Sequence, residues 1–120
     1  MLQVHSLPVP PSPSDARRIG NLELRPAELQ VLVDGIRAGL TVREFELFSV
    51  LVDRYDRVVP RPDIYELVWG GNMPYRDRSV DVFVRKVRRK LNTVAPDWQY
   101  IHTHFGIGYR FAPVPVDDAA

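Results

Sequence analysis

The sequence predicts an α+β fold with a small N-terminal antiparallel sheet, then three helices, then a C-terminal β-hairpin. Three observations predict it. Alternating apolar residues surround Asp34-Gly35, apolar residues then recur at helical spacing up to Leu91, and Gly106-Ile107-Gly108 separates two segments of β-favouring residues. The chain has 120 residues and no cysteine. It can therefore form one modest core, without disulfides, thiol catalysis or cysteine-based zinc sites.

Both ends of the chain are expected to lie outside this fold. Residues 1–18 are rich in proline and serine and predict a flexible linker or tail. Residues 113–120 predict a short acidic flexible tail, which leaves residues 19–112 for the folded domain. No apolar run approaches the roughly 18 residues that a membrane span needs, and no signal peptide is expected. We therefore expect a cytoplasmic chain without a membrane partner.

The first sheet is predicted over residues 19–38. Leu29, Val31 and Val33 alternate with their neighbours, as strand residues do when one face is buried. Asp34-Gly35 lies between Leu32-Val33 and Ile36, and this dipeptide is typical of a two-residue hairpin turn.

The first two helices have recognisable ends. Thr41 and Glu44 have the spacing of a capping box, and Leu40 and Phe45 that of a hydrophobic staple. The apolar residues that follow at helical spacing are Phe45, Phe48, Leu51, Val52 and Tyr55. The second helix is predicted to begin at Pro62 and to end at Gly70-Gly71, followed by a loop to residue 77. Its inner face is expected to consist of Ile64, Leu67 and Val68.

The third helix is predicted from about Arg78 to Leu91, before a break around Pro96. At about 100° per residue, one stripe is apolar and predicted to be buried: Val80, Val84, Val87 and Leu91, with Phe83 close by. Arg78, Arg85 and Arg89 lie on the opposite side, with Ser79 and Lys86 on one flank and Asp81 and Arg88 on the other. Asp81 is expected to hold Arg85, its i+4 neighbour.

The basic face of this helix predicts an anionic polymer as partner. The chain has a formal net charge of only +1, but residues 76–90 carry +5 of it and the remainder −4. Val82 lies among the arginines, where an apolar side chain suits a thymine methyl group in the major groove of double-stranded DNA. A helix-turn-helix protein uses such a face for bases and phosphates. Arg85 and Lys86 are the candidates near bases, and Arg78, Arg88 and Arg89 are candidates for phosphates.

Four segments together resemble the OmpR/PhoB-type winged-helix domain, the DNA-binding half of many bacterial two-component response regulators. They are LTVREFELFSVL at 40–51, RPDIYELVWG at 61–70, DRSVDVFVRKVRRKL at 77–91 and IHTHFGIGYRF at 101–111. The resemblance implies a winged helix-turn-helix, with the third helix in the major groove and the hairpin, or wing, near the minor groove. The matching positions are Ser79, Val82, Phe83, Arg85, Lys86 and Arg88, with Gly106, Gly108 and Tyr109 on the wing.

The chain departs from this family at three positions. Phe105 stands where many relatives have an arginine before the first wing glycine, so a minor-groove arginine is not expected here. Arg110, or His104 beside it, is the candidate for a phosphate contact from the wing. Phe83 replaces a residue that is often polar in relatives, and Lys86 replaces a frequent arginine, whose planar fork a lysine lacks.

The resemblance also implies partners. The loop at 70–76 can face RNA polymerase, and two domains can bind repeated half-sites as a homodimer. A receiver domain needs more than a hundred further residues. The chain is therefore either the effector part of a longer regulator or a stand-alone protein, and the proline-rich lead favours the former.

Two other classes of function compete with this one. An enzyme would need a nucleophile beside an oriented base, and no phosphate-cradling glycine loop is present, so we expect no catalytic residues and no cofactor. His102 and His104 lie on one strand face, but without a third ligand we expect no metal site. A winged helix that binds RNA polymerase or a regulatory partner, without reading DNA sequence, is the alternative function. Its apolar contact points would be Tyr75, Phe83, Phe105 and Ile107.

Overall fold

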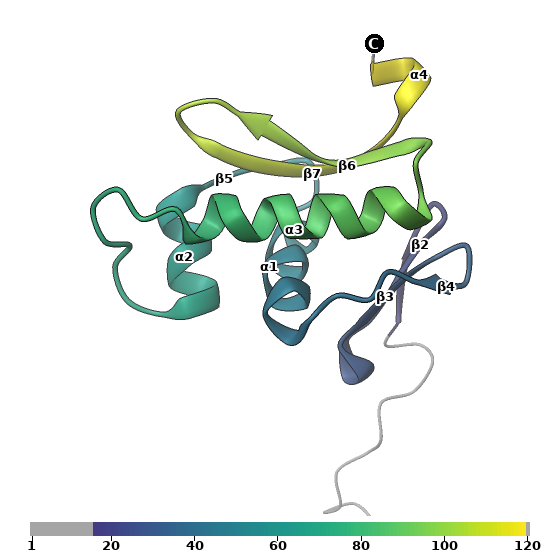
Figure 1. The fold of residues 1–120 in the computed structure, drawn as a ribbon, viewed down its shortest axis with the longest axis horizontal. Helices are drawn as coiled ribbons and strands as arrows, with labels where there is room; N and C mark the ends of the chain where they lie inside the picture. Colours follow the sequence, from purple (N-terminus) through teal and green to yellow (C-terminus); the bar gives the residue numbers. More distant parts are fainter. Residues whose placement is uncertain (1–15, 120) are drawn as a thin grey trace, which may run out of the picture.

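A computed structural model describes residues 16–119, with two antiparallel sheets arranged around three main helices. Helix α3 (Ser79–Val94) crosses the middle of the molecule, below the C-terminal hairpin in the view of Figure 1. Helices α1 (Val42–Asp53) and α2 (Arg61–Trp69) lie on the other side of α3 from that hairpin in this view. The predicted α+β class and element order are confirmed.

The N-terminal sheet has the strand order β1-β2-β3-β4 and consists of Arg17–Ile19, Leu22–Arg25, Gln30–Val33 and Ile36–Arg37. The predicted hairpin is present: Val33 pairs with Ile36, and Asp34 and Gly35 have φ of 50° and 80°. Two positive φ values define the type I′ turn that matches the twist of the strands.

Two parts of this region differ from the prediction. Arg17 and Arg18, assigned to the linker, pair with Leu24 and Glu23 in the sheet. Leu29, predicted to continue the strand alternation, instead follows a 3-10 turn at Pro26–Glu28 with a φ of 53°. The proline begins this turn and interrupts the strand, because its ring removes a backbone donor.

Helix α1 begins with the predicted capping box. The Glu44 backbone N–H donates to the Thr41 hydroxyl at 3.3 Å, and the Thr41 N–H donates to the Glu44 carboxylate at 2.8 Å. Glu44 is only 3% exposed and also accepts a hydrogen bond from Lys90 of α3 at 2.7 Å. Tyr55, predicted to continue the helical spacing, instead lies beyond the end of α1 and is 50% exposed.

Helix α2 turns Ile64 and Val68 onto the core, as predicted, but not Leu67. Ile64 is fully buried, but Leu67 is 50% exposed. Tyr65 and Trp69 pack on the core instead, with their rings stacked 5.3 Å apart. At about 100° per residue, these two aromatic residues and Ile64 define an inward arc from which Leu67 points away.

The second sheet has the strand order β5-β7-β6, formed by Val58–Pro60, Gly108–Pro115 and Trp98–His104. Strands β6 and β7 are the predicted hairpin. Strand β7 continues to Pro115, which pairs with Trp98, and a short helix α4 (Val116–Ala119) follows. The first residues of the tail predicted at 113–120 are therefore part of the sheet as far as Pro115, because the backbone of β6 provides partners for them.

One apolar core joins both sheets to the three main helices. Phe48 of α1 meets Phe111 of β7 edge to face at 5.5 Å, and Tyr100 of β6 donates to Asn21 beside β2 at 3.0 Å. Among the helices of residues 16–119, none combines the length and apolarity needed to cross a membrane. This shared core fixes α3 and the β6–β7 hairpin against each other.

Candidate nucleic-acid interface

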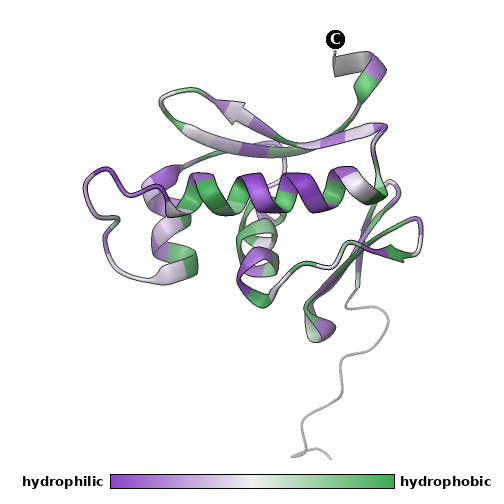
Figure 2. Cartoon of the chain, viewed as in Figure 1, coloured by the Kyte–Doolittle hydropathy of each residue, from purple (hydrophilic) through white to green (hydrophobic). Residues whose placement is uncertain are grey.

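Helix α3 buries one stripe and exposes the opposite face. The predicted stripe is confirmed, since Val80, Val84, Val87 and Leu91 are each at most 3% exposed. Hydrophobic and hydrophilic residues alternate along the helix in Figure 2, as its amphipathic pattern requires. The outward residues are Arg78, Val82, Arg85, Lys86 and Arg89. Val82 is 40% exposed, so an apolar side chain does lie among the cations.

The start of α3 is fixed by a carboxylate. Asp77 accepts a hydrogen bond from the Ser79 backbone N–H at 2.7 Å, and this satisfies one of the donors that a helix start leaves open. Ser79 is partly buried at this end. Its hydroxyl lies in the first turn of the basic face, the position expected from the family pattern.

Asp81 joins α2, α3 and the wing. Its carboxylate accepts hydrogen bonds from Arg61 Nε at 2.7 Å and from the Tyr109 hydroxyl, and Arg78 Nε lies 3.3 Å away. The predicted partner, Arg85, is not among them, so that prediction is wrong. The i+4 rule considers only the helix itself, whereas the donors that reach Asp81 from other elements are closer.

The charge of Asp81 is stabilised by these donors. Burial disfavours the ionised carboxylate, but the hydrogen bonds from Tyr109 and Arg61 outweigh it and hold the pKa of Asp81 below its ordinary value. Burial, with the neighbouring carboxylate, raises the pKa of Tyr109. The phenol therefore remains a hydrogen-bond donor at neutral pH.

Arg88 faces the wing. Its guanidinium donates to the Ile101 carbonyl at 3.0 Å and to the Thr103 hydroxyl at 2.6 Å, and lies 5.5 Å from the centre of the Tyr109 ring. Arg61 lies over the same ring at 4.9 Å. Burial lowers the pKa of Arg88. Arg88, predicted to contact phosphate, thus already has partners within the fold.

Phe83 and Lys86 lie on the flank of α3 that faces α2. The Phe83 ring meets Trp69 edge to face at 5.3 Å and packs on the core. The Lys86 ammonium lies 4.7 Å from the centre of the Phe83 ring while the residue stays exposed. Phe83 is therefore turned toward the protein, and Lys86 remains on the outer surface.

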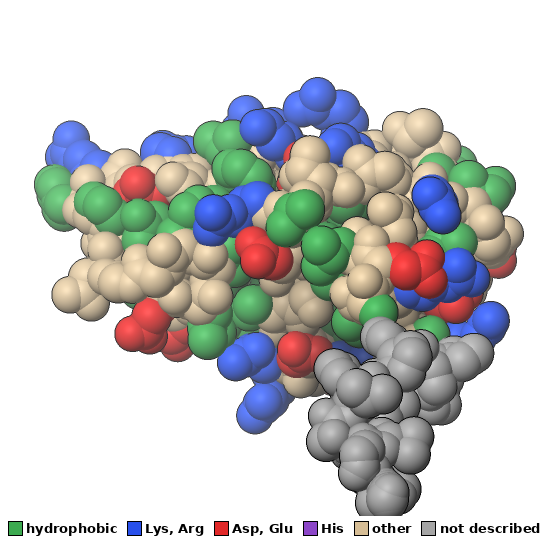
Figure 3. Space-filling view, turned by 90° about the horizontal axis from the view of Figure 1, so that it is seen from below, with side chains coloured by type: hydrophobic (Ala, Val, Ile, Leu, Met, Phe, Trp, Pro, Cys, Tyr) green, Lys and Arg blue, Asp and Glu red, His purple; other side chains and the backbone are tan. Residues whose placement is uncertain are grey.

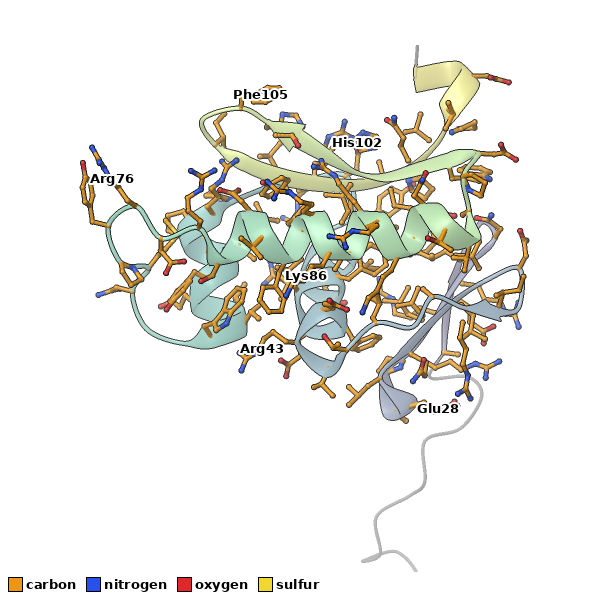
Figure 4. The ribbon with its side chains drawn as sticks, viewed as in Figure 1. Glu28, Arg43, Arg76, Lys86, His102 and Phe105 are labelled. Carbon is orange, nitrogen blue, oxygen red and sulfur yellow. The ribbon has the colours of Figure 1, made fainter. Side chains whose placement is uncertain are left out.

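The wing ends in a tight turn that projects one aromatic side chain. The Ile107 N–H donates to the His104 carbonyl at 2.9 Å, and Gly106 has a φ of 78°, as the third position of a type II turn requires. Phe105, at the second position, is 89% exposed. Figure 4 shows Phe105 at the outer end of the wing, near the end of α3 where the chain enters the helix.

The polar residues of the wing have partners in the fold. Arg110 forms an ion pair with Asp56 at 2.7 Å and donates to His104 Nε2 at 3.1 Å. His102 Nε2 lies 2.8 Å from the Ala112 carbonyl oxygen, a distance at which the ring N–H donates to it. The phosphate contact expected of Arg110 or His104 therefore has competing partners within the protein.

A shallow hollow lies between α3 and the wing. Its lining residues are Arg61, Arg78, Asp81, Arg85, Arg88, Thr103, Phe105 and Tyr109. In the view of Figure 3, Lys and Arg side chains line the upper edge of the molecule, whereas charges of both signs are mixed over the rest of that face. A surface with this excess of cations beside one helix is suited to a polyanion.

The contacts of three residues of this site were not predicted from the sequence. Arg61, Thr103 and Tyr109 come from α2, β6 and β7, and only the tertiary fold brings them to α3. No spacing pattern connects them. The only available signal was that Tyr109 matches a family position on the wing.

The arrangement defines a class of protein. A helix with a basic outer face, braced by a preceding helix and flanked by a β-hairpin, is a winged helix-turn-helix domain. The chain belongs to the family described as "Transcriptional regulatory protein, C terminal", whose model matches residues 35–111.

Relatives of known sequence and structure agree with this family. The phosphate regulon transcriptional regulatory protein PhoB of Pseudomonas aeruginosa is 33% identical over 94 residues, which cover 78% of this chain and 40% of that protein. CreB of Escherichia coli is 35% identical over 98 residues, covering 82% and 43%. The chain therefore spans about two fifths of the length of these relatives.

A solved structure with the same fold is the Klebsiella pneumoniae RstA DNA-binding domain in complex with the RstA box. Its TM-score to this chain is 0.74 at 28% identity, over 82% of this chain and 98% of that one. The predicted resemblance to OmpR/PhoB-type domains is confirmed.

Proposed function

We propose that this chain is the sequence-specific, double-stranded DNA-binding part of a bacterial transcription regulator that acts by binding, without catalysis, in the cytoplasm. The observation that carries the proposal is the outward face of α3, where Arg85, Lys86 and Arg89 surround Val82. A surface that bound protein alone would not need this concentration of positive charge on one helix. The complex of the related RstA domain with its DNA box supports the proposal.

Each outward residue has a proposed role. An α-helix is about as wide as the major groove, so α3 can lie in it with its outer face toward the base edges. Val82 then contacts a thymine methyl group, and Arg85 and Lys86 reach purine acceptors. Arg78, Arg89 and the Ser79 hydroxyl contact phosphates. Arg88, Phe83, His104 and Arg110 position the helix and the wing and are not proposed as direct contacts.

Selection of bound duplexes from random DNA, followed by titration at several salt concentrations, tests the proposal. The four outward cations are Arg78, Arg85, Lys86 and Arg89. If each offsets one phosphate charge, the slope of log K against log salt is about −3.6. We expect one sequence motif to be enriched and the slope to lie near this value. No enrichment and no salt dependence would show that the chain does not bind DNA.

The variant Val82→Asp tests whether α3 reads the bases, since it places a carboxylate against them. It should weaken binding to the selected site by about 1–3 kcal/mol. Val116→Asp is the control, because Val116 has the same exposed fraction of 40% but lies on α4. If the two variants bind equally well, α3 is not the reading helix.

We also propose that the 70–76 loop faces RNA polymerase and that two copies of the domain occupy repeated half-sites. Tyr75 is 87% exposed, and Arg76 lies over its ring at 5.2 Å. Figure 4 shows Arg76 at the outer end of this loop. Tyr75→Ala should therefore reduce activation in a reconstituted transcription assay while leaving DNA affinity unchanged. A loss of DNA affinity in this variant would assign the loop to the DNA instead.

A further inference from the structure

The tip of the wing carries an apolar surface that the fold does not use. Phe105 is 89% exposed and Ile107 is 54% exposed, on either side of Gly106. Holding a phenyl ring in water is unfavourable, and a hairpin turn can be formed by small polar residues instead. The exposed ring therefore indicates a contact outside the domain.

The wing, over residues 98–115, offers no free cation for such a contact. It contains a single arginine and two histidines. Arg110 is held by Asp56 and His104, and the His102 ring is hydrogen-bonded to the Ala112 carbonyl. Whatever the tip of the wing binds, it must bind through apolar contact.

The tip is held rigidly in place. The Arg61 backbone N–H donates to the Ile107 carbonyl at 3.1 Å, which fixes the turn to the start of α2. Gly108 lies so close to β5 that a Cβ there would be 1.9 Å from the Val59 carbonyl oxygen. Arg88 holds strand β6 to α3. Phe105 is therefore presented in one position and needs little ordering on binding.

The position of the tip points to the minor groove. Phe105 lines the same hollow as Arg78 and Arg85, so it approaches DNA together with α3. A helix fills most of the major groove, which is about 12 Å wide. A hairpin beside that helix must pass over the bounding phosphate backbone, and its tip meets the next minor groove.

We propose that Phe105 inserts its ring into a base step from the minor groove, partly unstacks that step and bends the duplex. This inference rests on the proposed DNA-binding function. Unstacking is least costly at flexible pyrimidine–purine steps, and apolar side chains act as wedges there. The domain therefore selects a TA or CA step at a fixed distance from the bases that α3 reads. Specificity at that step comes from deformability and not from a hydrogen bond.

Fluorescence of 2-aminopurine, placed in turn at each position beside the selected site, tests the wedge. With the wild-type domain we expect emission to rise severalfold at one step only. Phe105→Ala should abolish this rise and weaken binding roughly tenfold. Phe105→Arg should regain affinity through phosphate contact but not the fluorescence signal. Ile36→Ala, at another exposed apolar residue on the N-terminal sheet, is the control and should change neither.

The outcomes separate this inference from the function on which it rests. If the wild-type domain enriches no DNA sequence, the proposed function fails. If it binds its site but no 2-aminopurine position responds, the wedge is wrong and the function stands. The wedge is equally wrong if Phe105→Ala loses affinity while the emission rise persists. A stiff A·T tract in place of the flexible step should weaken the wild-type domain but not Phe105→Ala.

Discussion

Replacing Asp81 by asparagine should loosen the joint between α2, α3 and the wing. The asparagine side chain has a similar shape but lacks the charge that Arg61 Nε and the Tyr109 hydroxyl meet. A hydrogen bond to a charged group contributes about 1.5–3 kcal/mol. The exposed Arg78 pair adds less than about 1 kcal/mol, and the amide oxygen of the new side chain can still accept one bond. We therefore expect the free energy of unfolding to fall by about 2 kcal/mol and Tm by about 10 °C.

The pH dependence identifies the cause. The pKa of Asp81 in the folded state lies below its ordinary value. The Asp81 carboxylate therefore stabilises the fold fully above the unfolded pKa of about 3.9. This stabilisation is lost as pH falls through the folded pKa. The stability difference between wild type and Asp81→Asn should therefore be full at pH 7 and shrink toward pH 3. Urea unfolding at several pH values, followed by circular dichroism, measures it.

Asp97→Asn provides the control, because Asp97 is an exposed residue at the turn before β6. It should change stability by less than about 0.5 kcal/mol at any of these pH values. If Asp81→Asn is as stable as wild type at pH 7, the carboxylate does not hold the joint. A deficit of equal size at pH 3 and pH 7 would assign the effect to packing and refute the electrostatic explanation.

Three further changes test other parts of the structure. Gly108→Ala should destabilise the fold by about 3 kcal/mol in urea, because its Cβ would lie 1.9 Å from a carbonyl oxygen of β5. Lys90→Met should cost about 2 kcal/mol, since it leaves the Glu44 carboxylate, 3% exposed, without its cation. Its deficit should shrink at low pH, where Glu44 is protonated. Arg89→Ala should reduce the salt slope of DNA binding by about 0.9, whereas Arg88→Ala should lower stability and leave that slope unchanged.

Control variants and contradicting outcomes distinguish the proposed causes from other effects of these substitutions. Gly71→Ala also places a Cβ on a glycine with a positive φ, of 73°, but into open space, so it should cost only about 1 kcal/mol. A Gly108→Ala loss of the same size would mean that β5 yields to the added atom. If Lys90→Met is as stable as wild type, the Thr41 N–H alone satisfies the buried carboxylate. An unchanged salt slope in Arg89→Ala would remove that residue from the interface.

Much of this fold could be predicted from local sequence patterns. The capping box at Thr41, the hairpin at Asp34-Gly35 and the buried stripe of α3 each depend on residues within one or two turns of each other. Patterns of this range are visible in one sequence, because spacing alone determines which side chains share a face.

The interactions that fix the site were not predictable in the same way. Asp81 has donors from α2 and β7, 20 and 28 residues away along the chain, which a helical wheel cannot include. The sequence analysis also placed Leu67 inward, because it considered only aliphatic residues and not Trp69, which packs on Phe83. The part of β7 beyond residue 112 was missed, since its pairing depends on the backbone of β6 and not on its own prolines.

The structure also explains how a chain with a net charge of only +1 can present a basic surface. The carboxylates nearest α3 are occupied: Asp77 caps the helix, Asp81 meets Arg61, and Glu44 meets Lys90. Asp81 also lies 3.3 Å from the outward Arg78, but none of these carboxylates pairs with Arg85, Lys86 or Arg89. The acidic residues thus fix the position of the helix, while Arg85, Lys86 and Arg89 remain available. Net charge is therefore a poor guide to this interface, and the number of cations on its outward face is the quantity that the salt slope should report.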